Sequence, residues 1–170
     1  NEKQLMQEIF LSHNFGHVGP YEITQLGING KMSEINAAMG LAVLEHIDTI
    51  IETRAAAIRF YTANLNEFWF RKFKIRELTT WNSGYYPVLL KDAEAMDELI
   101  QYLNSNDIFP RRYFYPILSS LPYLDNNDEL EYPIASETSM RILCLPLYAF
   151  MPEEILLKVV CSINTFFESR

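Results

Sequence analysis

The sequence has little cysteine, little glycine and few basic residues, and each shortage excludes a class of protein. Its two cysteines, Cys144 and Cys161, form no CxxC pair and no zinc spacing. We therefore expect two free, buried thiols, with a single disulfide as the alternative. Six glycines and eight prolines in 170 residues are too few for a collagen-like or low-complexity chain. Fourteen Lys and Arg against 22 Asp and Glu give a formal charge of −8, which argues against nucleic-acid binding.

Long apolar runs are also missing. No stretch reaches the roughly 18 uninterrupted apolar residues that a membrane span needs. The N-terminus lacks the layout of a secretory signal and does not begin with Met, so we expect a cytoplasmic fragment that contacts no membrane. Apolar residues are nevertheless abundant at 49%, and aromatic residues reach 14%. This composition is typical of a globular chain with a large core or partner surface.

The order of apolar patterns predicts an α+β fold. A short helix over residues 1–10 is followed by a long irregular segment over 11–31, and such segments are often functional. Helical periodicity then begins at Ser33, a good N-cap, and continues to about Leu65. A helix of that length suggests a connector between two bodies of structure.

Residues beyond this helix alternate between strand and helix patterns. Strands are predicted over 72–77, 84–90 and 108–115, and an apolar run follows over 142–147. Pro87 is expected near the start of its strand or at a sheet edge. Residues 118–135 are predicted as loop, and 137–141 as a helical turn. Helices are predicted over 93–106 and from Pro152, the second with a buried stripe of Ile155, Leu156, Val159, Val160, Ile163, Phe166 and Phe167.

Two groups of residues are candidates for binding. The segment Gly27-Ile28-Asn29-Gly30 precedes a helix, so it is either a turn with Asn29 in a left-handed conformation or an anion site that uses the Asn29 amide. His13 and His17 have a metal-ligand spacing, but no further ligands are apparent nearby and we predict no metal site.

The second group lies in the strand predicted over 108–115. Alternation would place Arg111, Tyr113 and Tyr115 on one face and Arg112 and Phe114 on the other. An arginine between tyrosines suits a phosphorylated or sugar-bearing ligand. A surface ion pair above an aromatic core is the alternative.

Several ordered motifs resemble one enzyme family. The stretch from Leu26 to Leu41, LGINGKMSEINAAMGL, closely resembles the G-x-N-x-[RK]-M-x-E-x-x-A-A-x-G-L segment of the DegT/DnrJ/EryC1/StrS sugar aminotransferases. Further similar segments follow at compatible spacing, and together they cover residues 11–165: Leu44–Asp48, Arg54, Tyr61, Arg111–Pro116 and Leu143–Tyr148 with Met151.

The resemblance implies a pyridoxal-phosphate (PLP) enzyme of the aspartate-aminotransferase fold, of which this chain is the C-terminal part. Residues 1–50 would be the end of the large domain, an interface loop and the start of the connecting helix. Residues 51–170 would be the small domain, with a short, mainly antiparallel sheet packed by helices. In the family, the lysine that binds PLP, the carboxylate paired with its ring nitrogen and the stacked aromatic residue all precede this chain.

The resemblance also implies roles for individual residues. The asparagine matching Asn29 reaches the cofactor phosphate of the neighbouring subunit, which implies a homodimer with shared active sites. Lys31 is interpreted as a structural or ion-pairing residue. Arg111, Arg112 and Tyr113 are the predicted substrate-binding residues, and no catalytic residue is predicted within this chain.

The family branch implied by these motifs aminates the 4-keto group of a dTDP-linked 6-deoxyhexose, with glutamate as amino donor, for polysaccharide or deoxysugar synthesis. Branches that act at C3 more often carry His where this chain has Tyr113. The fragment alone should be inactive. Two alternatives stay open: a noncatalytic binding or dimerisation module of the same fold, and a PLP-dependent sugar dehydratase.

Overall fold

The computed structural model describes residues 2–123 and 132–170, and the chain divides into two units. Unit 1 is Asn1–Ile47 and unit 2 is Asp48–Arg170. The part of the predicted 118–135 loop that spans 124–131 lies outside the described residues. No helix in the described ranges is long and apolar enough to cross a bilayer.

A three-stranded antiparallel sheet in the order β1-β2-β3 organises unit 2. β2 (Tyr86–Leu90) lies in the middle, between β1 (Phe70–Lys72) and β3 (Ile142–Leu145). Pro87 is the second residue of β2 and pairs with Cys144 of β3, beyond the last β1 pair at Val88. Proline has no N–H to donate to a neighbouring strand. At Pro87 no such donor is needed on the β1 side, because β1 does not extend that far.

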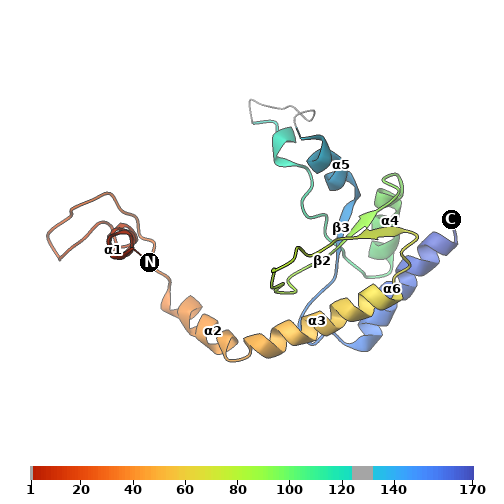
Figure 1. Cartoon of the computed structure of the whole chain (residues 1–170), viewed down its shortest axis with the longest axis horizontal. Helices are drawn as coiled ribbons and strands as arrows, with labels where there is room; N and C mark the ends of the chain where they lie inside the picture. Colours follow the sequence, from red (N-terminus) through yellow and green to blue (C-terminus); the bar gives the residue numbers. More distant parts are fainter. Residues whose placement is uncertain (1, 124–131) are drawn as a thin grey trace. The chain divides into compact units, whose positions relative to one another are not determined.

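Within its described residues, unit 2 also contains four α-helices and one short 3-10 turn. They are α3 (Ile47–Asn64), α4 (Ala95–Ser105), η1 (Leu118–Ser120), α5 (Pro133–Arg141) and α6 (Glu153–Glu168). Figure 1 shows α3, α4 and α6 gathered around the sheet. The Asn164 side chain of α6 donates a hydrogen bond to the Asn64 carbonyl at the end of α3, at 3.3 Å.

The core of unit 2 is one cluster of apolar side chains from these elements. α6 contributes six buried residues at helical spacing, and α4 contributes Met96, Leu99 and Leu103. Alternate residues of β2 (Tyr86, Val88 and Leu90) are buried in the same cluster. The predicted stripe of α6 is confirmed at six of its seven residues, with Ile155 half-buried. Burial of a face with that spacing is what stabilises a surface helix.

Tyr61 connects α3 to the segment after β3. Its side chain is fully buried, and its hydroxyl donates a hydrogen bond to the Pro146 carbonyl at 2.9 Å. Burial, with Tyr148 and Tyr86 nearby, raises the pKa of Tyr61 well above its ordinary value. The phenol therefore stays neutral in the folded chain at pH values where an exposed tyrosine ionises.

We expect Tyr61→Phe to destabilise unit 2 by about 1–3 kcal/mol at pH 7, because it leaves the half-buried Pro146 carbonyl without its donor. The wild-type chain should also lose stability as pH rises above about 10, since only the unfolded state then releases the proton. Urea unfolding at pH 7 and at pH 10–11 measures both effects. Tyr21→Phe, which changes an almost fully exposed side chain, is the matched control. Equal stabilities of Tyr61→Phe and wild type at pH 7 would contradict this role.

The long helix predicted from Ser33 to Leu65 is two helices, and this prediction was wrong in length. α2 (Glu34–Leu44) ends at Glu45, and α3 begins at Ile47. At the break, the His46 N–H donates to the carbonyl of Val43, three residues back, which interrupts the four-residue ladder. The predicted start is confirmed, since the Ser33 hydroxyl accepts a hydrogen bond from the Asn36 N–H.

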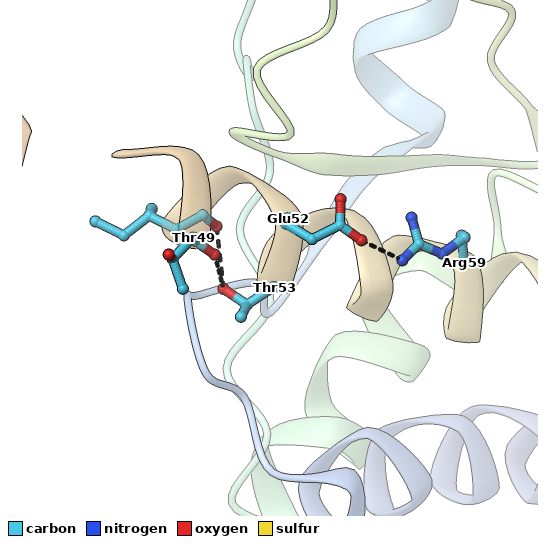
Figure 2. A network of polar contacts seen from close by, with 5 residues as sticks. Thr49, Glu52, Thr53 and Arg59 are labelled. Carbon is cyan, nitrogen blue, oxygen red and sulfur yellow. Dashed lines mark hydrogen bonds and ion pairs between the residues drawn. The ribbon is translucent and has the colours of Figure 1, made fainter. Parts of the chain in front are cut away.

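The polar face of α3 carries local contacts that stabilise the helix only slightly. Figure 2 shows the Thr53 hydroxyl donating to the Thr49 carbonyl at 2.9 Å, and Arg59 paired with Glu52 at 2.7 Å. Both charged side chains are mostly exposed, so the pair contributes at most about 1 kcal/mol. The stability of α3 comes instead from its buried residues Ala57, Ile58 and Tyr61.

Two strand predictions and one cysteine prediction need correction. β1 begins at Phe70, whose buried side chain anchors it, and the predicted strand 72–77 overlaps it only at Lys72. Residues 108–115 form no strand: only Arg111 pairs, with Cys144, since Pro110 lies within the segment and Pro116 follows it directly. Both cysteines are free, but Cys161 is exposed and only Cys144 is buried.

Unit 1 has almost no core of its own. It consists of α1 (Lys3–Ser12), the irregular segment that follows and α2, and Gly16 is its only buried residue in the described part. Large apolar side chains are exposed along both helices: Leu5, Met6, Ile9, Phe10, Ile35, Met39, Leu41 and Leu44. Exposed apolar area of this extent is typical of an interaction surface.

Candidate functional site

Asn29 lies in a short antiparallel pairing within unit 1. Asn14 and Asn29 face each other in an isolated bridge. On either side of them, the Phe15 N–H donates to the Ile28 carbonyl at 3.0 Å, and the Gly30 N–H donates to the His13 carbonyl at 2.8 Å. Asn29 does not have a positive φ, so the left-handed turn considered for this residue is wrong.

Glycine is required where the two paired segments approach each other. A Cβ at Gly27 would lie 2.3 Å from the Gly16 nitrogen and 2.7 Å from the Ser12 carbonyl oxygen. Gly16 has a φ of +76°, and a Cβ there would lie 1.8 Å from the Gln25 oxygen. The Gln25 side chain secures the loop to α1 through hydrogen bonds to the Glu8 carbonyl and the Ser12 hydroxyl.

The Asn29 side chain is exposed, and no hydrogen bond to it occurs within residues 2–123 and 132–170. Its amide carries two donors that a ligand or another subunit could accept. Lys31 lies two residues further along, and its ammonium donates to Asn14 Oδ1 at 3.0 Å while lying 4.3 Å from the centre of the Phe15 ring.

The second group of candidate residues, Arg111 to Tyr113, begins at a single backbone pairing between Arg111 and the sheet. Arg111 exchanges two backbone hydrogen bonds with Cys144 of β3, at 3.0 and 2.8 Å. Its exposed guanidinium donates to the Tyr113 hydroxyl, and the Tyr113 ring packs edge-on against Tyr85. Arg111 and Tyr113 therefore meet, as the strand prediction required, although no strand forms there.

Arg112 has a different environment, and its predicted neighbours were wrong. Its guanidinium lies 3.6 Å from the centre of the Tyr115 ring, which had been placed with Arg111. It also donates to the carbonyls of Ser139 and Met140 at 3.3 and 3.4 Å, in the last turn of α5. A cation at a helix C-terminus is favoured by the helix dipole, so this arginine holds its segment against α5.

The two neighbouring arginines allow a matched stability test. We expect Arg112→Met to lower the free energy of unfolding of unit 2 by about 1–3 kcal/mol, because charge-assisted hydrogen bonds to α5 are lost. Arg111→Met, at an exposed position, should change it by less than about 0.5 kcal/mol. Urea denaturation of both variants compares them directly. Equal effects would show that Arg112 does not hold the segment.

The remaining chemistry-bearing groups provide no further reactive centre within the described residues. Burial raises the pKa of the Cys144 thiol, and a hydrogen bond from the Tyr113 backbone partly offsets this. No cluster of three or more His, Cys, Asp or Glu able to hold a metal occurs within 2–123 and 132–170. Five lysines whose side chains are described are all exposed: Lys3, Lys31, Lys74, Lys91 and Lys158.

Residues 1–164 match the DegT/DnrJ/EryC1/StrS aminotransferase family. The chain belongs to this family. Among its relatives is the dTDP-4-amino-4,6-dideoxy-D-glucose transaminase of Shigella dysenteriae, which is 36% identical over 168 residues, 96% of this chain and 46% of the relative. The Escherichia coli protein of the same name is 35% identical over 164 residues, 86% of this chain and 41% of the relative.

Solved structures of aminotransferases share the fold. A putative sugar aminotransferase from Streptococcus pneumoniae superposes with a TM-score of 0.89 at 18% identity, over 99% of this chain and 44% of that chain. The same protein has a structure in its PLP form. This DegT/DnrJ/EryC1/StrS chain thus spans a little less than half the length of the relatives that it matches, with the α+β fold expected of a C-terminal portion of such an enzyme.

Proposed function

We propose that the chain is the C-terminal portion of a PLP-dependent nucleotide-sugar aminotransferase. The complete enzyme would transfer an amino group from glutamate to the 4-keto group of a dTDP-4-keto-6-deoxyhexose, for polysaccharide or deoxysugar synthesis in the cytoplasm. The observation that carries this proposal is the family match over residues 1–164, with two relatives above 30% identity that are named as transaminases of a dTDP sugar.

The division into two units supports a different role for each part of the chain. Residues 1–50 would complete the large domain and provide the interface loop and the start of the connecting helices, and residues 51–170 would be the small domain. The exposed apolar side chains of α1 and α2 support this assignment, because they would be covered by the rest of the large domain and by a second subunit. The complete enzyme would then be a homodimer with shared active sites.

The residues around Asn29 fit a PLP phosphate. An exposed amide with two unused donors, held on a rigid pairing, can donate to phosphate oxygens. PLP supplies the electron sink that amino-group transfer requires. The described lysines are all exposed, which agrees with a covalent anchor located outside this chain.

On the substrate side, we propose that Arg111 and Tyr113 contact the nucleotide sugar. Their side chains are hydrogen-bonded to each other. The Arg111 guanidinium is exposed and able to pair with a phosphate. Arg112 would contribute to the same site by fixing the backbone between them, because its own guanidinium already contacts α5 and Tyr115.

We expect Asn29→Ala to weaken PLP binding by the complete enzyme at a cost of about 1–3 kcal/mol, since one charge-assisted hydrogen bond is lost. Equilibrium dialysis of the apo-enzyme against PLP gives the dissociation constants of variant and wild type. Asn66→Ala, which removes an amide from a turn in unit 2, is the control. Unchanged affinity of Asn29→Ala would remove Asn29 from the cofactor site.

Isotope labelling tests the activity and separates the alternatives. The complete enzyme with PLP is incubated with a dTDP-4-keto-6-deoxyhexose and glutamate that carries ¹⁵N in its amino group. An aminotransferase yields an amino sugar that carries ¹⁵N, and 2-oxoglutarate. A dehydratase consumes the sugar and gives a product that contains no ¹⁵N, and a noncatalytic module leaves the sugar unchanged. Either result contradicts the proposal.

A further inference from the structure

Asn14 and Asn29 form an antiparallel pair of the type whose side chains lie closest together. The hydrogen bonds on either side of them connect their neighbours, Phe15 to Ile28 and Gly30 to His13, and none connects the two residues themselves. In such a non-hydrogen-bonded pair the Cα atoms are about 4.5 Å apart and both side chains point to the same face. The Asn14 amide, which no sequence pattern singled out, therefore lies beside the Asn29 amide.

Lys31 belongs to the same face. It follows Asn29 by two residues, and its ammonium reaches the Asn14 side chain. The hydrogen bond from Lys31 Nζ to Asn14 Oδ1, at 3.0 Å, agrees with this arrangement. The Phe15 ring, 4.3 Å from Nζ, holds the ammonium from another direction.

The Lys31 contact also determines how the Asn14 amide is oriented. An ammonium only donates hydrogen bonds, so the Asn14 oxygen must face Lys31 and the Asn14 NH₂ group must face away from it. Among the described residues, no acceptor is bonded to that NH₂ group or to the Asn29 amide, and no carboxylate forms an ion pair with Lys31. The three side chains thus present donors and one positive charge, in a chain of net charge −8.

We propose that Asn14 and Lys31 complete, together with Asn29, a binding site for one phosphate group. This inference rests on the proposed function, in which phosphate is carried both by PLP and by the dTDP diphosphate of the substrate. Two amide groups and an ammonium offer several donors to the oxygens of a tetrahedral oxyanion, and one of these donors is charged. Lys31 thereby has two functions: it orients Asn14 and it neutralises the ligand.

The test uses the complete apo-enzyme and two variants, Asn14→Asp and Lys31→Met. Asn14→Asp keeps the shape and the acceptor for Lys31 but replaces the NH₂ donors with a negative charge. We expect each variant to weaken binding of the phosphate ligand by about 10- to 100-fold, measured by calorimetry separately for PLP and for dTDP. Asn66→Asp is the matched control, because the oxygen that accepts from the Phe68 N–H is kept.

The two titrations identify the source of the phosphate. Weakened PLP binding with unchanged dTDP binding assigns the site to the cofactor, and the reverse assigns it to the substrate diphosphate. Either result supports the proposal, and unchanged affinity for both ligands in both variants overturns it.

Inorganic phosphate separates this inference from the proposed function. A phosphate site should raise the melting temperature of the wild-type apo-enzyme in phosphate relative to chloride at equal ionic strength, and Asn14→Asp should lose that shift. If the wild type binds neither PLP nor dTDP but shows the shift and the variant does not, the activity proposal fails and the phosphate site stands. An equal shift in wild type and Asn14→Asp, or none in either, overturns the site.

Discussion

Replacing Gly27 with alanine should disrupt the pairing that holds Asn29 and cause the largest loss of cofactor affinity of any single substitution in unit 1. The new Cβ would lie 2.3 Å from the Gly16 nitrogen and 2.6 Å from the Phe15 carbonyl carbon. These are backbone atoms, so the two segments must separate, and the Ile28 N–H would lose its 2.8 Å hydrogen bond to the Ser12 carbonyl. We expect a local cost on the order of 3 kcal/mol or more.

Gly19→Ala is the matched control for this prediction, because no heavy atom lies within 4 Å of a Cβ there. Hydrogen–deuterium exchange over residues 12–30 of the complete enzyme, together with its PLP affinity, measures the effect. Gly27→Ala should show faster exchange and weaker binding, while Gly19→Ala should match wild type. Wild-type exchange and affinity in Gly27→Ala would show that close approach at this glycine does not organise the site.

The second large effect is the complete absence of a covalent product: the 170-residue chain alone should form no specific lysine-linked adduct with PLP. The resemblance to sugar aminotransferases implies that the cofactor lysine precedes this chain. The lysines whose side chains are described are exposed, so none of them is desolvated in the way that activates a nucleophilic lysine.

Borohydride reduction followed by peptide mass spectrometry tests this prediction. The complete enzyme, as the positive control, should carry one adduct per subunit at a lysine outside this sequence. The isolated chain should show at most trace modification spread over several lysines. Stoichiometric modification of a single lysine between residues 1 and 170 would contradict the prediction and place the covalent anchor within this chain.

Elements with a strong local signal were predictable from the sequence. α4 and α6 carry apolar residues at helical spacing, and the same residues are buried in the core of unit 2. Ser33 begins α2 as an N-cap because its hydroxyl can accept a backbone N–H only three residues away. Each of these features is signalled by residue types at spacings of three or four positions.

Elements that depend on distant partners were less predictable. Aromatic alternation over 108–115 suggested a strand, but only Arg111 pairs with β3, more than thirty residues later in the chain. The break between α2 and α3 at Glu45 and His46 involves neither glycine nor proline. A local pattern could not reveal either feature.

The candidate site likewise contains residues that a local motif identifies and residues that only the folded structure brings together. Asn29 was identified through a glycine-flanked motif, and Gly27 within that motif is explained by the close approach of Gly16. Asn14 lies fifteen residues earlier and meets Asn29 only through the antiparallel pairing. Arg111 and Arg112 were both predicted to bind substrate, but the guanidinium of Arg112 contacts α5 while that of Arg111 is exposed.

The central claim is that the Asn29 amide binds the phosphate of a cofactor held largely by other polypeptide. A crystal structure of the complete, PLP-loaded enzyme tests it most directly. We predict that Asn29 Nδ2 lies at hydrogen-bond distance, about 2.7–3.2 Å, from a phosphate oxygen of the PLP bound by the neighbouring subunit. An Asn29 side chain that faces solvent, away from both the subunit interface and the cofactor, would contradict the account.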